Sequence, residues 1–248
     1  MSCDDLMAGH GCVTQSEHTR FYSRQLITAD DLTQDQIYYR AKRRAHNRLL
    51  HGWGIVCGLE VKANPISGAS VTITICPGYA LSPQGDEIYV PKDVQFDLAR
   101  CLAGQDAPCH HPCAPVTPRA VDSAGELYVA IKYVECLSHP VRVSPIGCGC
   151  DETACEYSRV RDGFEITCLE SLPDSHGEAF QISDTLCRSV NDTRVVGCPM
   201  CPTSPWIVLA RVRMKGEEIG MLSFDSRHVL LSTAMVQAHL SAKCDEER

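Results

Sequence analysis

The chain has 248 residues, 44% of them hydrophobic, which is enough for one large or two small domains with a proper core. Its formal net charge of −8 argues against nucleic acid as the main partner. No apolar run reaches the length of a membrane span, and the start of the chain lacks the apolar stretch of a secretory signal. The sequence therefore predicts synthesis in the cytoplasm and no membrane span.

A helix is the first element that the sequence predicts. Residues 1–20 show no periodic pattern and are expected to form a flexible tail. Thr28 and Asp31 then have the spacing of a capping box, in which the side chain of each residue bonds the backbone N–H of the other. Gly52 follows a basic turn and is the expected stop, because glycine ends helices at no steric cost. We therefore expect one long helix from Thr28 to Gly52.

This predicted helix carries two apolar stripes on roughly opposite sides at 100° per residue. We expect one stripe to pack against the chain's own domain and the other against a partner subunit. The alternative is a solvated basic face over an ordinary core helix. Since aromatic and arginine side chains dominate interfaces, the predicted interface residues are Tyr39, Arg43, Arg48 and Trp53. The first stripe comprises Ile37, Tyr38, Ala41, Ala45 and Leu49, and the second comprises Leu32, Tyr39 and Leu50.

Alternation of apolar and polar residues follows the helix and predicts half-buried strands in two blocks. The predicted fold class is α+β, with a mainly antiparallel β body, one long N-terminal helix and cysteine-rich loops. The expected organisation is the flexible tail, the helix with a small β-domain (21–100), a cysteine- and proline-rich linker (101–125), and a second β-domain with cysteine-rich loops and a short C-terminal helix (126–248).

Sixteen cysteines are unusual for a cytoplasmic chain, where they more often bind metal or are buried than form disulfides. The C-P-M-C-P turn aims Cys198 and Cys201 at one tetrahedral ion. A glycine-rich loop offers further thiolates, so a structural zinc site of four thiolates is predicted; disulfides or free thiols are the alternatives. The loop ligands are Cys148, Cys150 and Cys155, and a second candidate site holds Cys109 and Cys113 beside His110 and His111.

The other cysteines and histidines that stand out are not expected to bind metal. Cys57, Cys76, Cys136 and Cys168 lie within strand patterns and are expected in the core. His46 and His51 lie five residues apart at the helix end, too far round the helix to share a ligand face.

No catalytic constellation is visible in the sequence. There is no G-x-S-x-G elbow, no H-E-x-x-H zinc motif, no P-loop and no dinucleotide fingerprint. The strip Asp225–His228 could pass for a polar active site, but we interpret it as the start of an edge strand whose arginine meets a neighbour. We therefore predict a protein that is not an enzyme.

The run FYSRQLITADDLTQDQIYYRAKRRAHNRLLHGWGIVCGLEV resembles the opening of an uncharacterised bacterial family. That family is associated with gene clusters for contractile injection systems, the phage-tail-like particles. Three further pieces resemble it, namely ITICPGYALSPQGDEIYVP, GCGCDETACEYSRVRDGFEI and CPMCPTSPWIVLARV. The resemblance implies a structural component or adaptor of such a particle, at the baseplate or fibre attachment, with other particle subunits as partners and release from the cell within the particle. It supplies no catalytic residues.

Two functions of other classes compete with this interpretation. One is a free-standing zinc-binding or redox protein, including a zinc hydrolase, which would need an open site of three protein ligands and a water. The other is a receptor- or carbohydrate-binding fibre module, which would need an exposed aromatic platform. The chain has only two tryptophans from which to build such a platform.

Overall fold

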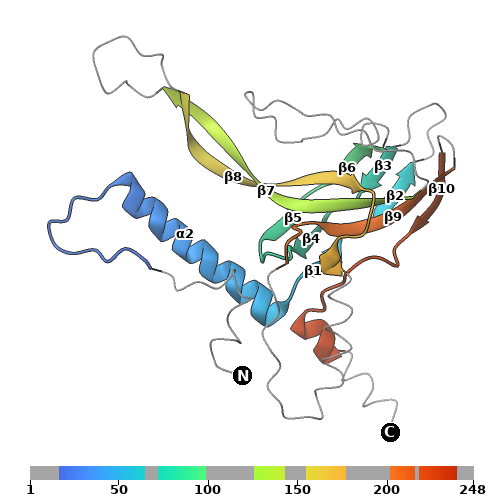
Figure 1. The fold of residues 1–248 in the computed structure, drawn as a ribbon, viewed down its shortest axis with the longest axis horizontal. Coiled ribbons are helices and arrows are strands. Elements are labelled where there is room, and N and C mark those ends of the chain that lie inside the picture. The colour runs from blue at the N-terminus through green and yellow to red at the C-terminus, as the bar shows by residue number, and fades with distance from the viewer. Residues whose placement is uncertain are drawn as a thin grey trace, which may run out of the picture.

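The computed structural model describes residues 17–64, 72–98, 126–142, 155–176, 202–215 and 218–238. Helix α2 (Ala29–His46) continues into the π-helical turn η1 (Asn47–His51), and antiparallel strands follow. The α+β class with a mainly antiparallel β body is thus confirmed (Figure 1). The helix is shorter than expected, with 18 α-helical residues and five in the π turn.

The strands form three sheets within the described part of the chain. The first has the order β1-β4-β5, the second β2-β3-β6 and the third β10-β9-β7-β8. Every strand pair within these sheets is antiparallel. The strands are β1 (Gly54–Gly58), β2 (Val61–Asn64), β3 (Thr72–Ile75), β4 (Gly78–Leu81), β5 (Glu87–Val90), β6 (Val94–Asp97), β7 (Glu126–Arg142), β8 (Cys155–Leu169), β9 (Ile207–Lys215) and β10 (Glu218–Ser223).

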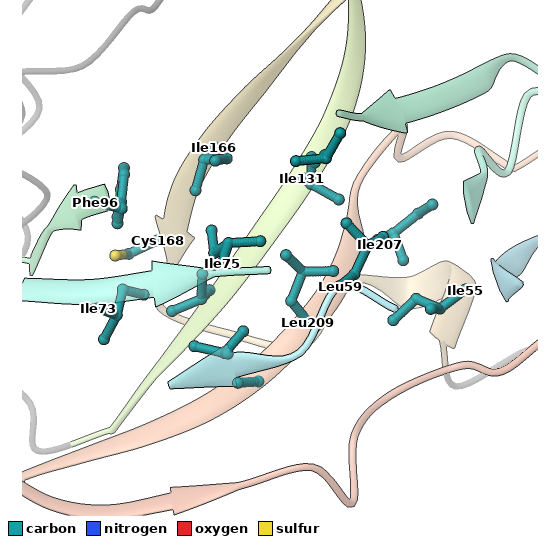
Figure 2. Packing of buried hydrophobic residues seen from close by; sticks show 14 of the residues in the cluster. Ile55, Leu59, Ile73, Ile75, Phe96, Ile131, Ile166, Cys168, Ile207 and Leu209 are labelled. Atoms are coloured by element: carbon teal, nitrogen blue, oxygen red, sulfur yellow. The ribbon is translucent and has the colours of Figure 1, made fainter. Parts of the chain in front are cut away.

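One hydrophobic cluster joins side chains from all three sheets. Strand β3 shows the predicted period of two, because Ile73 and Ile75 are fully buried while Thr72 and Thr74 alternate with them. Strand β9 lies between β10 and β7, and its residues 207–210 are all buried. Figure 2 shows the cluster where these strands meet. The core therefore draws on both predicted β blocks.

The helix begins where the sequence predicts. Thr28 is the N-cap, its hydroxyl accepts from the Asp31 N–H (3.2 Å), and the Asp31 carboxylate accepts from the Thr28 N–H (2.9 Å). The Thr28 hydroxyl also donates to the Asp31 carboxylate (2.7 Å). The backbone bond from Thr28, and then this hydroxyl bond, hold the pKa of Asp31 below its ordinary value. Gly52 ends the π turn at φ 84°, a backbone conformation that glycine adopts readily. The predicted start at Thr28 is confirmed, and Gly52 ends the helical segment as predicted, but the α-helix itself ends at His46 and the last turn is π-helical.

We expect Thr28→Ala to loosen the first turn of α2 by about 1 kcal/mol, since the cap hydroxyl would be lost. The β body should keep its unfolding midpoint, because no residue of α2 is buried. Amide hydrogen exchange measures the effect as faster exchange in residues 29–33. Thr33→Ala is the control, because the Thr33 hydroxyl bonds the Ala29 carbonyl (2.8 Å) within the helix and caps nothing. Equal exchange in the two variants would contradict the capping role.

The segment after β10 folds back onto β1. The Ile55 N–H donates to the His228 carbonyl (2.8 Å), and the Leu230 N–H donates to the Ile55 carbonyl (2.9 Å). Arg227 donates to the carbonyls of Gly58 (2.9 Å) and Leu59 (3.1 Å). The arginine of the polar strip thus meets its own chain, contrary to the prediction that it meets a neighbour. Residues 233–238 then form the expected short C-terminal helix.

Candidate functional site

The side of α2 that faces the β body is polar. Arg44 donates to the Asp86 carboxylate (2.6 Å), and Arg40 forms an ion pair with Glu135 of β7. At the end of the helix, the Asn47 amide donates to the Gly85 carbonyl (2.9 Å). Gly85 allows this approach, because a Cβ there would lie 2.2 Å from the Arg44 carbonyl oxygen. The helix is therefore held by ion pairs and hydrogen bonds along its arginine edge.

A hydrogen-bonded group on the β7–β8 ribbon receives the Arg40 side chain. The Tyr133 hydroxyl donates to Asp162 (2.6 Å) and also lies 3.2 Å from Glu135, the ion-pair partner of Arg40. Burial, and then the hydrogen bond to Asp162, raise the pKa of Tyr133. The ribbon thus presents the Glu135 carboxylate to the helix, and its ion pair with Arg40 helps to explain why an arginine edge faces the body.

Both apolar stripes of the helix are left without cover from the body. In the second stripe Leu32 is 53% exposed, Tyr39 64% and Leu50 70%. In the first stripe Ile37 is 47% exposed and Leu49 39%. The structure thus differs from the expectation that one stripe packs against the chain's own domain. In Figure 1 the blue helix accordingly projects away from the sheets along most of its length.

The N-terminal segment runs back along the far half of the helix. The Thr19 hydroxyl donates to the Asp31 carbonyl (3.0 Å), and the His18 ring lies 4.7 Å from the Tyr38 ring. The loop between this segment and the helix exposes further apolar side chains, with Tyr22 69% and Leu26 86% exposed. The apolar surface therefore extends from the second stripe to the far tip of the helix.

A shallow hollow lies on the outer side of the helix near its end. Its apolar lining comes from Ala45, Leu49 and Leu50, and Lys42, Arg43 and His46 complete it. Such a hollow suits an apolar side chain that is flanked by an acidic group, because the basic side chains stand beside the apolar wall.

Of the four predicted interface residues, two are exposed and two are buried. Tyr39 is exposed, and Arg43 is also exposed, with its guanidinium 4.0 Å from the Glu87 carboxylate. Arg48 and Trp53 are instead buried, at 6% and 9% exposure. Their side chains lie inside the chain because the turn after the helix leads directly into β1 and the core. They are therefore not available to a partner here, and an interface role for Tyr39 and Arg43 stays a prediction.

Two histidines enclose Trp53: His176, which the sequence did not single out, and His228, the last residue of the polar strip. The His228 ring stacks on the indole at 4.1 Å, and the His176 ring meets it edge-on at 4.9 Å. The Val208 N–H donates to Nε2 of His176 (3.1 Å), so that ring is neutral with its proton on Nδ1. Burial, and then the charge of His228, lower the pKa of His176 to about 4; burial likewise lowers the pKa of His228. We interpret the group as a folding element.

The predicted zinc ligands lie outside the described residues. This applies to Cys109, Cys113, Cys148, Cys150, Cys198 and Cys201, whereas Cys155 is placed in β8 by its backbone alone. In the described part of the chain, no group of three or more histidine, cysteine or acidic side chains could hold a metal. The zinc site stays a prediction.

The cysteines that were expected in the core behave differently from one another. Cys168 is buried in the hydrophobic cluster, while Cys57 is exposed and Cys76 half-buried, both with free thiols. Cys136 and Cys168 each take part in a disulfide, and not with each other, because the register of β7 and β8 places them seven residues apart along the ladder. The exposure of Cys57 follows from its place at the end of β1, where the strand register shifts between Ile55 and Cys57.

A pair of histidines at the end of the helix is brought together. Nε2 of His46 lies 3.3 Å from Nε2 of His51, and the ring centroids are 5.1 Å apart at 62°. Both residues are exposed. The residue spacing predicted these rings on different faces of an α-helix, whereas η1 is π-helical.

Among the described residues, no helix combines the length and apolar character that a membrane crossing requires. No family model and no curated protein matches this chain. A solved structure described as "Crystal structure of TssK" is similar, with a TM-score of 0.36 and 11% identity over 85% of this chain and 43% of that one. This chain thus spans less than half of that protein, and a likeness at this TM-score carries no argument about function.

Proposed function

We propose that this protein is a structural component or adaptor of a contractile phage-tail-like particle, at the baseplate or fibre attachment, and that it acts by docking of its N-terminal helix on another subunit. The observation that carries the proposal is the uncovered helix, since no residue of α2 is buried although it holds two apolar stripes. The motif from Phe21 to Val61, which resembles the opening of a family associated with such particles, supplies the kind of partner.

The exposed area is large enough to drive association only if the whole helix takes part. Burial of one large apolar side chain contributes about 1.5–3 kcal/mol, so the exposed parts of Leu32, Tyr39 and Leu50 would contribute about 3–5 kcal/mol together. Association costs at least about 4 kcal/mol. The stripe alone therefore only balances this cost. Burial of Tyr22 and Leu26 at the tip would add the further free energy that association needs, so the interface spans both the stripe and the tip.

The polar attachment of α2 to the body suits a docking element. Arg40 and Arg44 fix the direction of the helix through Glu135 and Asp86, and their ion pairs use none of the apolar surface. A helix held in one direction loses little freedom when a partner binds, and this lowers the cost of docking. The proposed role needs no catalytic group. The protein would be made in the cytoplasm and carried within the particle.

Tyr39→Glu tests the docking surface, because glutamate favours the helix as well as most residues do and introduces a charge at the apolar stripe. The protein should sediment with sheath-bearing particles that are visible by electron microscopy, and Tyr39→Glu should remain in the soluble fraction. Loss of an interface hot spot costs about 2 kcal/mol or more, so we expect roughly thirtyfold weaker association.

Tyr89→Glu is the matched control for this experiment. Tyr89 is 65% exposed on strand β5, so the same substitution there changes the charge by the same amount on the β body. It should leave sedimentation with the particles unchanged. Equal retention of both variants would contradict helix docking, and absence of the unaltered protein from the particle fraction would contradict the proposed function itself.

A further inference from the structure

We propose that His46 and His51 form a binding site for a divalent transition-metal ion of the zinc class, with the remaining coordination positions open to solvent. The site lies at the body end of the helix, uses none of the predicted cysteine ligands, and does not depend on the proposed function. Both imidazoles are exposed, so water or the side chains of another molecule can complete the coordination.

The distance between the two ring nitrogens matches that of two ligands on one tetrahedral ion. Zinc binds histidine nitrogen at about 2.0–2.1 Å, so two nitrogens at the tetrahedral angle lie about 3.3–3.4 Å apart. Nε2 of His46 and Nε2 of His51 are 3.3 Å apart. The rings are tilted by 62°, so they converge at their Nε2 edges and do not stack. The two nitrogens are thus spaced to share one ion.

The π turn is what creates this geometry. In an α-helix residues five apart lie about 140° apart around the axis, so His46 and His51 would point in different directions. In η1 the Gly52 N–H donates to the Asn47 carbonyl (3.0 Å), which is the bond between residues five apart that defines a π turn. Residues five apart are thereby brought close to the same face. Such turns are frequent at functional sites.

The electrostatics at this end of the helix are mixed. The C-terminal end of a helix carries partial negative charge, which favours a cation. Lys42 and Arg43 stand nearby and oppose one, although Glu87 partly balances the Arg43 charge at 4.0 Å. Two neutral imidazoles bind a zinc-class ion through directed bonds, whereas a magnesium ion prefers oxygen ligands. We therefore expect the site to bind copper and zinc ions more tightly than magnesium.

A hydrogen bond between the two imidazoles is the competing explanation of the same distance, with one ring donating and the other accepting. The two explanations differ in a measurable way. A hydrogen-bonded pair takes up no metal, whereas a chelating pair takes up one equivalent that disappears when the rings are replaced.

The test is calorimetric titration of the full chain with Zn²⁺, in the unaltered protein and in H46N/H51N. The double variant should bind one equivalent fewer, and each single variant should weaken that equivalent at least about tenfold. Cu²⁺ bound at the same site should show two nitrogen ligands by electron paramagnetic resonance. Circular dichroism checks that the helix is kept.

H139N is the matched control, because His139 is an exposed histidine of β7 outside the pair. It should bind as many equivalents as the unaltered protein. The cysteines are the same in all of these proteins, so zinc on thiolates cancels in the comparison. Equal stoichiometry and affinity in H46N/H51N and the unaltered protein would overturn the proposal, as would a Cu²⁺ spectrum that is the same in both.

Discussion

Trp53→Ala should destabilise the protein by about 3–5 kcal/mol, the range for removal of a large aromatic side chain from a core. Trp53 is 9% exposed and belongs to the main hydrophobic cluster. Its removal would also leave His176 and His228 without the ring that they contact at 4.9 and 4.1 Å. Since a small domain is stable by only about 5–15 kcal/mol, this single change should bring the protein close to unfolding.

Chemical denaturation, followed by circular dichroism, measures this loss. Tyr39→Ala is the control, because Tyr39 is an aromatic residue only 14 positions earlier but is 64% exposed, and it should change the midpoint little. If Trp53→Ala kept its stability and lost only its association with a partner, Trp53 would be an interface residue and its burial in this structure would be irrelevant to its role.

Acidification should cost the protein about 3 kcal/mol of stability between pH 6.5 and pH 4 through His176 alone. The pKa of His176 falls to about 4 in the folded chain, because burial excludes the charged ring, while the unfolded chain titrates near 6.5. The unfolded state therefore binds more protons in this window. Stability is complete above pH 6.5, falls as the pH decreases, and levels off below pH 4 as far as this group is concerned.

Unfolding curves at successive pH values test this expectation. His176→Gln removes the titration but keeps an acceptor for the Val208 N–H, so its stability should fall less steeply over the same window. Some dependence should remain in the variant, because burial also lowers the pKa of His228. Parallel curves for the two proteins would show that His176 does not become harder to protonate on folding.

The group around Trp53 is buried and contributes to stability, whereas the helix is exposed and is proposed to contribute to binding. Trp53, His176 and His228 join the turn after the helix to the third sheet and to the segment that returns along β1. The helix itself has no fully buried residue and is held through its arginine edge. Substitutions in the first group should therefore be detected by denaturation, and substitutions on the helix surface by binding. This separation makes the docking proposal testable.

The sequence alone determined the elements that depend on neighbouring residues. The capping box of Thr28 and Asp31 needs a separation of only three positions, and Gly52 ends the helix through its own backbone freedom. The alternation in β3 follows from the strand period. The half-buried strands were likewise predictable, because alternation is a local signal, whereas pairings between non-consecutive strands, such as β1 with β4, depend on the tertiary structure.

Only the tertiary structure decided which face of the helix meets the body. Hydrophobicity favours burial of an apolar stripe, but the nearby parts of the body offer the carboxylates of Asp86 and Glu135, and Asp86 lies 42 residues from its partner Arg44. Likewise, Trp53 is buried because His176 and His228 come from distant segments. The histidine pair arises from one shifted hydrogen bond in η1, which the residue pattern does not reveal. Long-range contacts and backbone bonding thus set the surface that function uses.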